Sequence, residues 1–136
     1  MAQTLVPDAT LDLLARSDAE LVAATVAQDP ADAFLHAHLA ALRAGAALVQ
    51  ARGRPGPRSR ARTVWDMVTY VAPELADYAA YFAGNAATRS AVEAGRASVD
   101  PARAERAGVV AEQFAEAVRA LLGDGEPQGH LALRAS

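Results

Sequence analysis

The chain has 136 residues, of which 52% are hydrophobic and 5% aromatic, and its formal net charge is −3. This length favours one domain with a single core, and the acidic charge excludes a protein whose whole surface binds nucleic acid. The chain contains no cysteine, which excludes disulfides, thiolate catalysis and cysteine-based zinc sites.

The first residues lack the basic and apolar pattern of a signal peptide, and no uncharged apolar run reaches the roughly 18 residues of a membrane span. We therefore expect a cytoplasmic protein with no membrane partner. In residues 1–28, Ser17 and Glu20 have the spacing of a capping box, which predicts two short helices packed on the rest of the domain.

Asp29 and Pro30 form a start signal, because aspartate caps exposed backbone donors and proline is tolerated in a first helical turn. Apolar residues then recur at helical spacing from Phe34 to Val49, which predicts a long helix ending near Arg52.

Thr63 is expected to cap the next helix, which Pro73 interrupts after Ala72. From Pro73 a second long helix is predicted to about Ala94, with Gly95 as its stop. Beside its large apolar side chains lies a ridge of small residues that would admit another helix, in the core or in a dimer: Ala76, Ala80, Ala83, Gly84, Ala87 and Ala91.

Asp100 and Pro101 repeat the start signal for a last helix, which Gly123 ends. Residues 123–136 are rich in turn-forming residues and are expected to form a disordered tail. No alternating strand pattern occurs. The prediction is an all-α, antiparallel bundle of four to five helices over residues 29–122.

The connection between the first two long helices is the strongest candidate for binding chemistry. It holds five arginines and no acid, and guanidinium groups grip phosphates in a bidentate, salt-dependent way. The alternative is a solvated surface loop. The candidate phosphate ligands in it are Arg54, Arg58, Arg60 and Arg62.

His36 and His38 resemble a metal pair at first sight. Residues two apart on a helix point in different directions, however, so no metal site is predicted, and His38 falls on the apolar stripe. A local pair of Asp32 with His36 is expected.

Tyr81, near the break at Pro73, is a candidate for a functional role at the protein surface. Glu112, Glu116 and Arg119 share a helix face, which is typical of a salt-bridged, solvated surface.

Three segments together resemble a small actinobacterial branch of the HEPN superfamily, the SAV_6107-like HEPN domains. They are residues 34–44, residues 100–103, and residues 63–83 with the pairs Trp65-Asp66 and Pro73-Glu74. The resemblance covers roughly residues 29–122. It implies a helical bundle that commonly dimerises and that in many members is a metal-independent ribonuclease.

The chain departs from the active members, which resemble one another in an arginine followed four to six residues later by a histidine. Neither His36, His38 nor His130 has such an arginine. RNA cleavage needs a general acid or base as well as charge at the phosphate. The hypothesis is therefore a non-catalytic homodimeric module, without cofactor, that binds RNA or nucleotide through the loop arginines and Arg103 and Arg106.

Two alternatives stay open. One is a divergent ribonuclease that uses His36 or His38 with an arginine supplied by the fold or a second subunit. The other is an adaptor that binds an unknown protein partner through the ridge at Ala80, Gly84 and Ala87.

Overall fold

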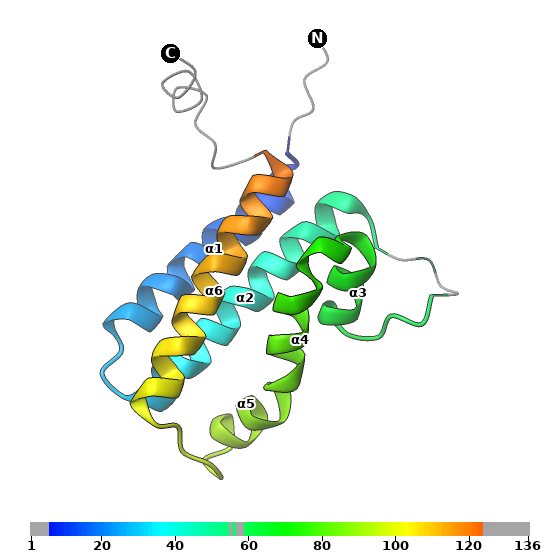
Figure 1. The fold of residues 1–136 in the computed structure, drawn as a ribbon. Helices are drawn as coiled ribbons and strands as arrows, with labels where there is room; N and C mark the ends of the chain where they lie inside the picture. Colours follow the sequence, from blue (N-terminus) through cyan, green and yellow to red (C-terminus); the bar gives the residue numbers. More distant parts are fainter. Residues whose placement is uncertain (1–5, 55, 57–58, 124–136) are drawn as a thin grey trace.

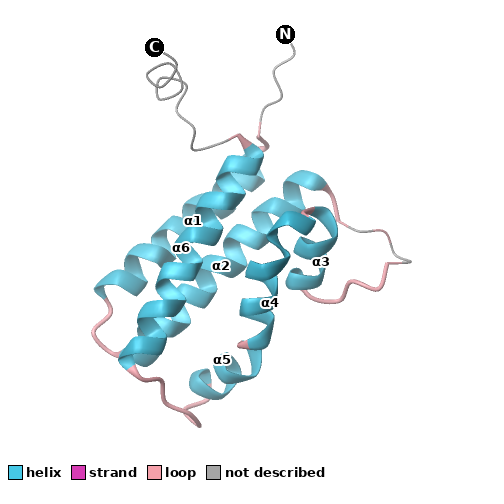
Figure 2. Ribbon diagram, viewed as in Figure 1, coloured by secondary structure: helices cyan, strands magenta, loops and turns pink. Residues whose placement is uncertain are grey.

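The computed structural model describes residues 6–54, 56 and 59–123, and in these residues it contains helices but no strand (Figure 2). The predicted all-α bundle is thus confirmed. The elements are α1 (Asp8–Val26), α2 (Pro30–Arg52), α3 (Val64–Val71), the short 3₁₀ helix η1 (Pro73–Leu75), α4 (Ala76–Gly84), α5 (Ala86–Glu93) and α6 (Pro101–Leu122). No helix in this part of the chain has the length and apolarity that crossing a bilayer requires.

Helix α2 lies at the centre of the molecule (Figure 1). It packs against α1 and α6 along one side and against the chain from α3 to α5 along the other. Helix α1 runs antiparallel to α2, whereas α2 and α6 begin at the same end. The buried hydroxyl of Ser17 donates a 2.8 Å hydrogen bond to the carbonyl of Ala40, which fixes α1 on α2.

The N-terminal region differs from its prediction, because the two short helices expected there are the single helix α1. The capping-box pattern at Ser17 and Glu20 is not used as a cap. Ser17 lies in the middle of α1 and bonds to α2, while Glu20 contacts His36 of α2. The side chains of Ser17 and Glu20 thus bond to residues of another helix, and not to the backbone at a helix start as the local pattern predicted.

The long helix expected from Pro73 to Ala94 is also interrupted. The break before Pro73 is present as predicted, but a second one occurs at Asn85, between α4 and α5. The Asn85 amide donates to the carbonyl of Tyr81 at 2.9 Å, and its oxygen accepts from Arg103. A side chain that bonds the backbone in this way competes with the helical ladder.

The other helix ends lie close to their predicted positions, although the cap bond expected from Asp29 is not formed. Thr63 forms a capping box with Asp66, and Asp100 accepts from the backbone N–H of Arg103 at 2.8 Å. Asp29 occupies the N-cap of α2 but makes no side-chain cap bond. Gly123 closes α6 in the left-handed conformation, with φ of 75°. The tail expected after it lies outside the described residues.

An aromatic group forms the contact between α6 and the α3–α4 side of the core. The Trp65 ring stacks on Phe82 with centroids 5.0 Å apart, and Phe114 meets the two rings at 5.7 and 5.9 Å. Alanines fill much of the rest of the α2 interface, so the helices approach closely there. Because α4 and α5 follow directly from this cluster, it sets their position over the start of α6.

Candidate nucleic-acid interface

The arginine-rich connection between α2 and α3 is partly held against α3. The Arg52 guanidinium donates to the carbonyl of Val71 at 3.2 Å, and that of Arg54 lies 3.6 Å from the sulfur of Met67. Arg60 and Arg62 are exposed. Arg58, a predicted phosphate ligand, lies outside the described residues.

The connection also has an anion of its own, in Asp66. Its carboxylate accepts from the backbone N–H groups of Arg62 at 3.0 Å and Thr63 at 3.3 Å. These bonds, the one from Arg62 first, lower the pKa of Asp66 below its ordinary value. Asp66 therefore stays ionised near neutral pH and offsets part of the positive charge at this end of the connection.

Arg103 and Arg106 stand in the first turns of α6, far along the chain from the connection. Arg103 donates to Asn85 at 2.5 Å and to Thr88 at 3.2 Å, and its guanidinium lies 5.6 Å from the Phe34 ring centroid. Arg106 lies 6.0 Å from the centroid of the Tyr81 ring. Within the described residues, neither arginine forms an ion pair with a carboxylate.

A hollow of about 350 Å³ lies between α2 and the segment from Thr63 to Arg89. Thr63, at the end of the connection, lines it together with Arg89 of α5 and His38 of α2. Trp65 and Phe82 are among its apolar walls. Thr63 follows Arg62 in the chain, and Arg103 of α6 bonds to Thr88, the neighbour of Arg89.

Arg89 is the residue that the sequence analysis missed. It lies four residues before Glu93 and pairs with it at 3.3 Å, a pattern typical of a solvated helix surface. The Arg89 side chain is nevertheless only 29% exposed, against 65% for Glu93. Nothing in the local sequence shows that α5 turns this arginine toward His38.

His38 is buried, as its place on the apolar stripe predicted, with 2% of its surface exposed. Its ring lies 4.4 Å from that of Phe34 and 5.3 Å from that of Phe82, and its Nε2 has no hydrogen-bond partner among the described residues. Burial, and then the charges of Arg89 and Arg103, lower the pKa of His38 to about 4. The imidazole is therefore neutral at neutral pH.

His36 lies on the α1 side of α2 and has a different partner from the one predicted. Its Nδ1 is 2.7 Å from a carboxylate oxygen of Glu20, and no bond to Asp32 is present. In the described part of the chain, no three residues of metal-ligating type gather around a common point. The two histidines thus have separate surroundings.

Tyr81 is half-buried rather than exposed, and it lies under Arg106. Burial raises the pKa of its hydroxyl, and the charges of Arg106 and Arg103 counteract part of this shift. At neutral pH the hydroxyl is protonated, so it can donate a hydrogen bond at the edge of the arginine group.

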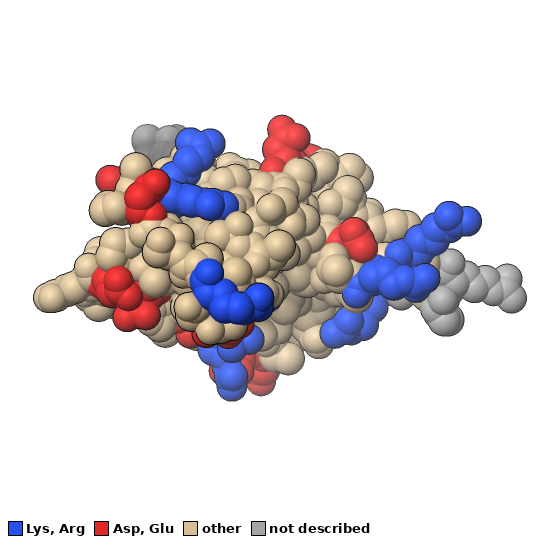
Figure 3. All heavy atoms as spheres, turned by 90° about the horizontal axis from the view of Figure 1, so that it is seen from below, with Lys and Arg blue, Asp and Glu red and all other residues tan. Residues whose placement is uncertain are grey.

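Figure 3 shows how the charges are distributed over the face at the start of α6. Arginine atoms form separate groups, one of them at the α2–α3 connection, and wide uncharged surface lies between them. The acids on this face are scattered among the groups. Any phosphate ligand here would contact local clusters rather than one continuous basic surface.

The structure is thus a small helical bundle that carries local clusters of arginines. Residues 24–119 match the family model of SAV_6107-like HEPN domains. The match covers more than half of the chain, which therefore belongs to this family of the HEPN superfamily. Comparisons with curated proteins and with solved structures found no match.

Proposed function

We propose that this HEPN domain binds phosphate groups of RNA or nucleotide without cleaving them. The observation that carries the proposal is the pair Arg103 and Arg106 in the first turns of α6, which have no ion-pair partner in the described residues. Arg103 also bonds to Thr88, the neighbour of Arg89. Guanidinium groups without a carboxylate partner keep their charge available for phosphate oxygens. Arg60 and Arg62, which are exposed and precede Thr63 in the chain, extend the proposed site.

The surroundings of the two histidines support binding rather than catalysis. A general acid or base must reach the 2′-hydroxyl of the RNA, within about 3 Å or through one water. His38 is buried, and its Nε2 is closed off from solvent. His36 contacts Glu20 on the α1 side of α2, away from Arg103 and Arg106.

One observation favours the ribonuclease alternative. The fold brings Arg89 and Arg103 near His38, which is the combination of residue types that the chain lacks at the usual sequence spacing. Cleavage through His38 would require α3 or α5 to move and open the hollow. The binding experiment below therefore includes recovery of the RNA.

The experiment measures fluorescence anisotropy of a labelled single-stranded RNA over a salt series, with the RNA recovered on a gel. Arg106→Ala is expected to weaken binding about 3- to 10-fold and to reduce the salt slope by about one. Arg16→Ala is the matched control, since Arg16 is an exposed arginine on α1 that pairs with Asp12. It should change the affinity less than about 2-fold.

No binding at low salt, or equal losses in the two variants, would contradict the proposal. RNA cleavage that is lost in His38→Gln would support the ribonuclease alternative instead.

The homodimer and the cytoplasmic location stay predictions. Ala80, Gly84 and Ala87 are not buried within this chain, which agrees with a seam there, and the molar mass from light scattering would test it.

A further inference from the structure

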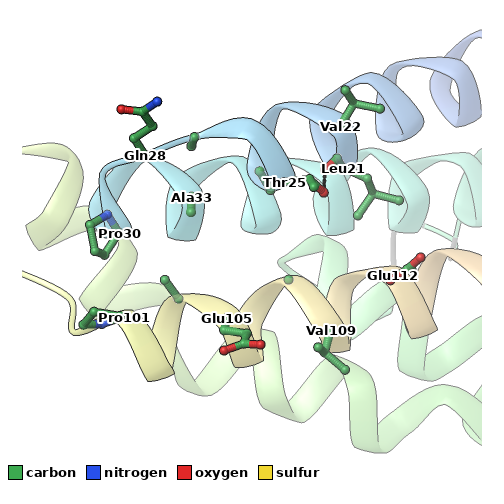
Figure 4. A pocket seen from close by; sticks show the side chains of 14 residues that line it. Leu21, Val22, Thr25, Gln28, Pro30, Ala33, Pro101, Glu105, Val109 and Glu112 are labelled. Atoms are coloured by element: carbon green, nitrogen blue, oxygen red, sulfur yellow. Dashed lines mark hydrogen bonds between the residues drawn. The ribbon is translucent and has the colours of Figure 1, made fainter.

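A second, larger hollow lies on the side of α1 and α6, away from the arginine clusters. It has a volume of about 610 Å³ and forms a groove between the last turns of α1 and the first half of α6, with the start of α2 beneath it. Figure 4 shows Leu21 extending from α1 toward α6 across this groove. We call it the α1/α6 groove.

Arg119 connects the two helices at one end of the α1/α6 groove. At its far end, Arg119 of α6 donates to the carbonyl of Leu14 at 3.3 Å and to the carboxylate of Asp18 at 2.6 Å. Toward the other end the facing residues are small, and a Cβ added to Gly108 would meet no atom within 4 Å. Small side chains therefore leave room that neither helix fills.

The groove is apolar, and large apolar side chains are exposed along it. Val22 is 62% exposed and Val109 is 47% exposed, and both line the groove. Val26 of α1, close by in the chain, is 68% exposed. Exposed apolar side chains gathered along a groove indicate a surface that another chain covers.

Two carboxylates give the groove a charge. Glu105 and Glu112 line it from α6, seven residues apart, and within the described residues neither has a cation at ion-pair distance. No arginine or histidine is among the described residues that line the groove. On a helix this spacing puts the carboxylates about 10 Å apart, nearly two turns, along one face.

We propose that the α1/α6 groove binds an amphipathic helix of a partner protein, whose apolar stripe fills the groove and whose basic side chains, about two turns apart, pair with Glu105 and Glu112. Such helices bind grooves through apolar residues at spacings of three, four and seven. A second copy of this chain is a poorer occupant, because pairing two such grooves face to face would set these carboxylates against one another. This inference does not depend on RNA binding.

The test uses two synthetic helical peptides of about 18 residues. Both carry leucines at helical spacing, and they differ only at two flanking positions seven apart, which are lysine in one and glutamate in the other. Binding to the full chain is followed by anisotropy. The lysine peptide is expected to bind at least about 10-fold more tightly than the glutamate peptide.

The protein variant Glu105→Lys/Glu112→Lys should reverse this preference. Glu74→Lys/Asp77→Lys makes the same change in net charge at exposed residues of η1 and α4, and it should keep the wild-type preference within about 2-fold. A folded circular dichroism spectrum establishes that each variant retains its helices. The reversal in the first variant and its absence in the second would support the proposal.

Three outcomes would overturn it. One is equal binding of the two peptides, or an equal change in the two variants. Another is self-association of the wild-type chain in sedimentation that the lysine peptide displaces, because the groove would then belong to a second copy. The third is binding of the lysine peptide to the protein variant Leu131→Glu/Leu133→Glu but not to the wild type. Residues 124–136 of the same chain would then be the occupant of the groove.

Discussion

The hollow beside α3 and α5 and the α1/α6 groove have opposite chemistry. Among the described residues, the one beside α3 and α5 is lined by Arg89 and His38 and by no carboxylate, whereas the α1/α6 groove is lined by Glu105 and Glu112 and by no cation. The first has aromatic walls from the core, and the second is lined by small residues and exposed valines. The cationic hollow and the acidic, apolar groove thus lie on separate sides of α2. The first suits an anionic ligand, and the second suits a ligand that is apolar and basic.

The two sides should also differ in how much they contribute to the free energy of unfolding, because the aromatic side chains are packed in the core. Phe114 is fully buried and contacts the rings of Trp65 and Phe82, so Phe114→Ala should lower the free energy of unfolding by about 3–5 kcal/mol. Val109→Ala, on the same helix at the groove, should lower it by only about 0.5 kcal/mol. Urea denaturation of both variants measures the contrast, and similar losses would show that the groove is packed rather than open.

The cationic side should also make stability depend on pH through His38. Its pKa is about 4 in the folded chain, below the ordinary 6.5, so the unfolded chain binds more protons between these values. The contribution of neutral His38 is complete above pH 6.5 and is lost as the pH falls toward 4. The loss amounts to about 3 kcal/mol at most.

Replacing the imidazole with a ring that does not titrate isolates this effect. His38→Phe should flatten the fall of unfolding free energy between pH 6.5 and 4, relative to the wild type, whatever it does to absolute stability. The carboxylates that titrate in the same range are common to both proteins, so the difference between the two curves reports His38. Parallel curves would mean that His38 is solvated in the folded chain.

The sequence predicted those parts of the fold that follow from local chemistry. Pro30 and Pro101 mark the first residues of α2 and α6, Thr63 caps α3, and Pro73 ends it, because each acts on the backbone within a turn. The resemblance to HEPN domains rested on these helices and on Trp65, and the family match agrees with it.

The rest depended on contacts between distant residues. Ser17 and Glu20 look like a cap, but Ala40 and His36 engage them, and Asn85 interrupts a helical pattern while Arg103 bonds to it. The local sequence indicates that Arg89 pairs with Glu93 on the surface of a helix. Only the packing of α5 brings it near His38. The α1/α6 groove has no signal in the local sequence, since residues of α1, the start of α2 and α6 line it together.

Two glycines in helix interiors, one on each side of the molecule, differ in the space around them. Gly45 of α2 faces the aromatic side, and a Cβ there would lie 3.3 Å from Cγ2 of Val68 and 3.5 Å from the Trp65 ring. Gly108 of α6 lines the groove, where a Cβ meets nothing within 4 Å. Both would gain the same helix propensity as alanine, about 0.5–1 kcal/mol.

We expect Gly108→Ala to realise this gain in full, and Gly45→Ala to lose part or all of it, because Val68 must shift to admit the methyl group. The free energies of unfolding in urea should therefore rank Gly108→Ala above both the wild type and Gly45→Ala. The reverse order would place a packed surface at Gly108 and leave no room for a bound helix. A gain at Gly108 would mean instead that the added methyl group meets open space in the α1/α6 groove, the space that a partner's side chains would occupy.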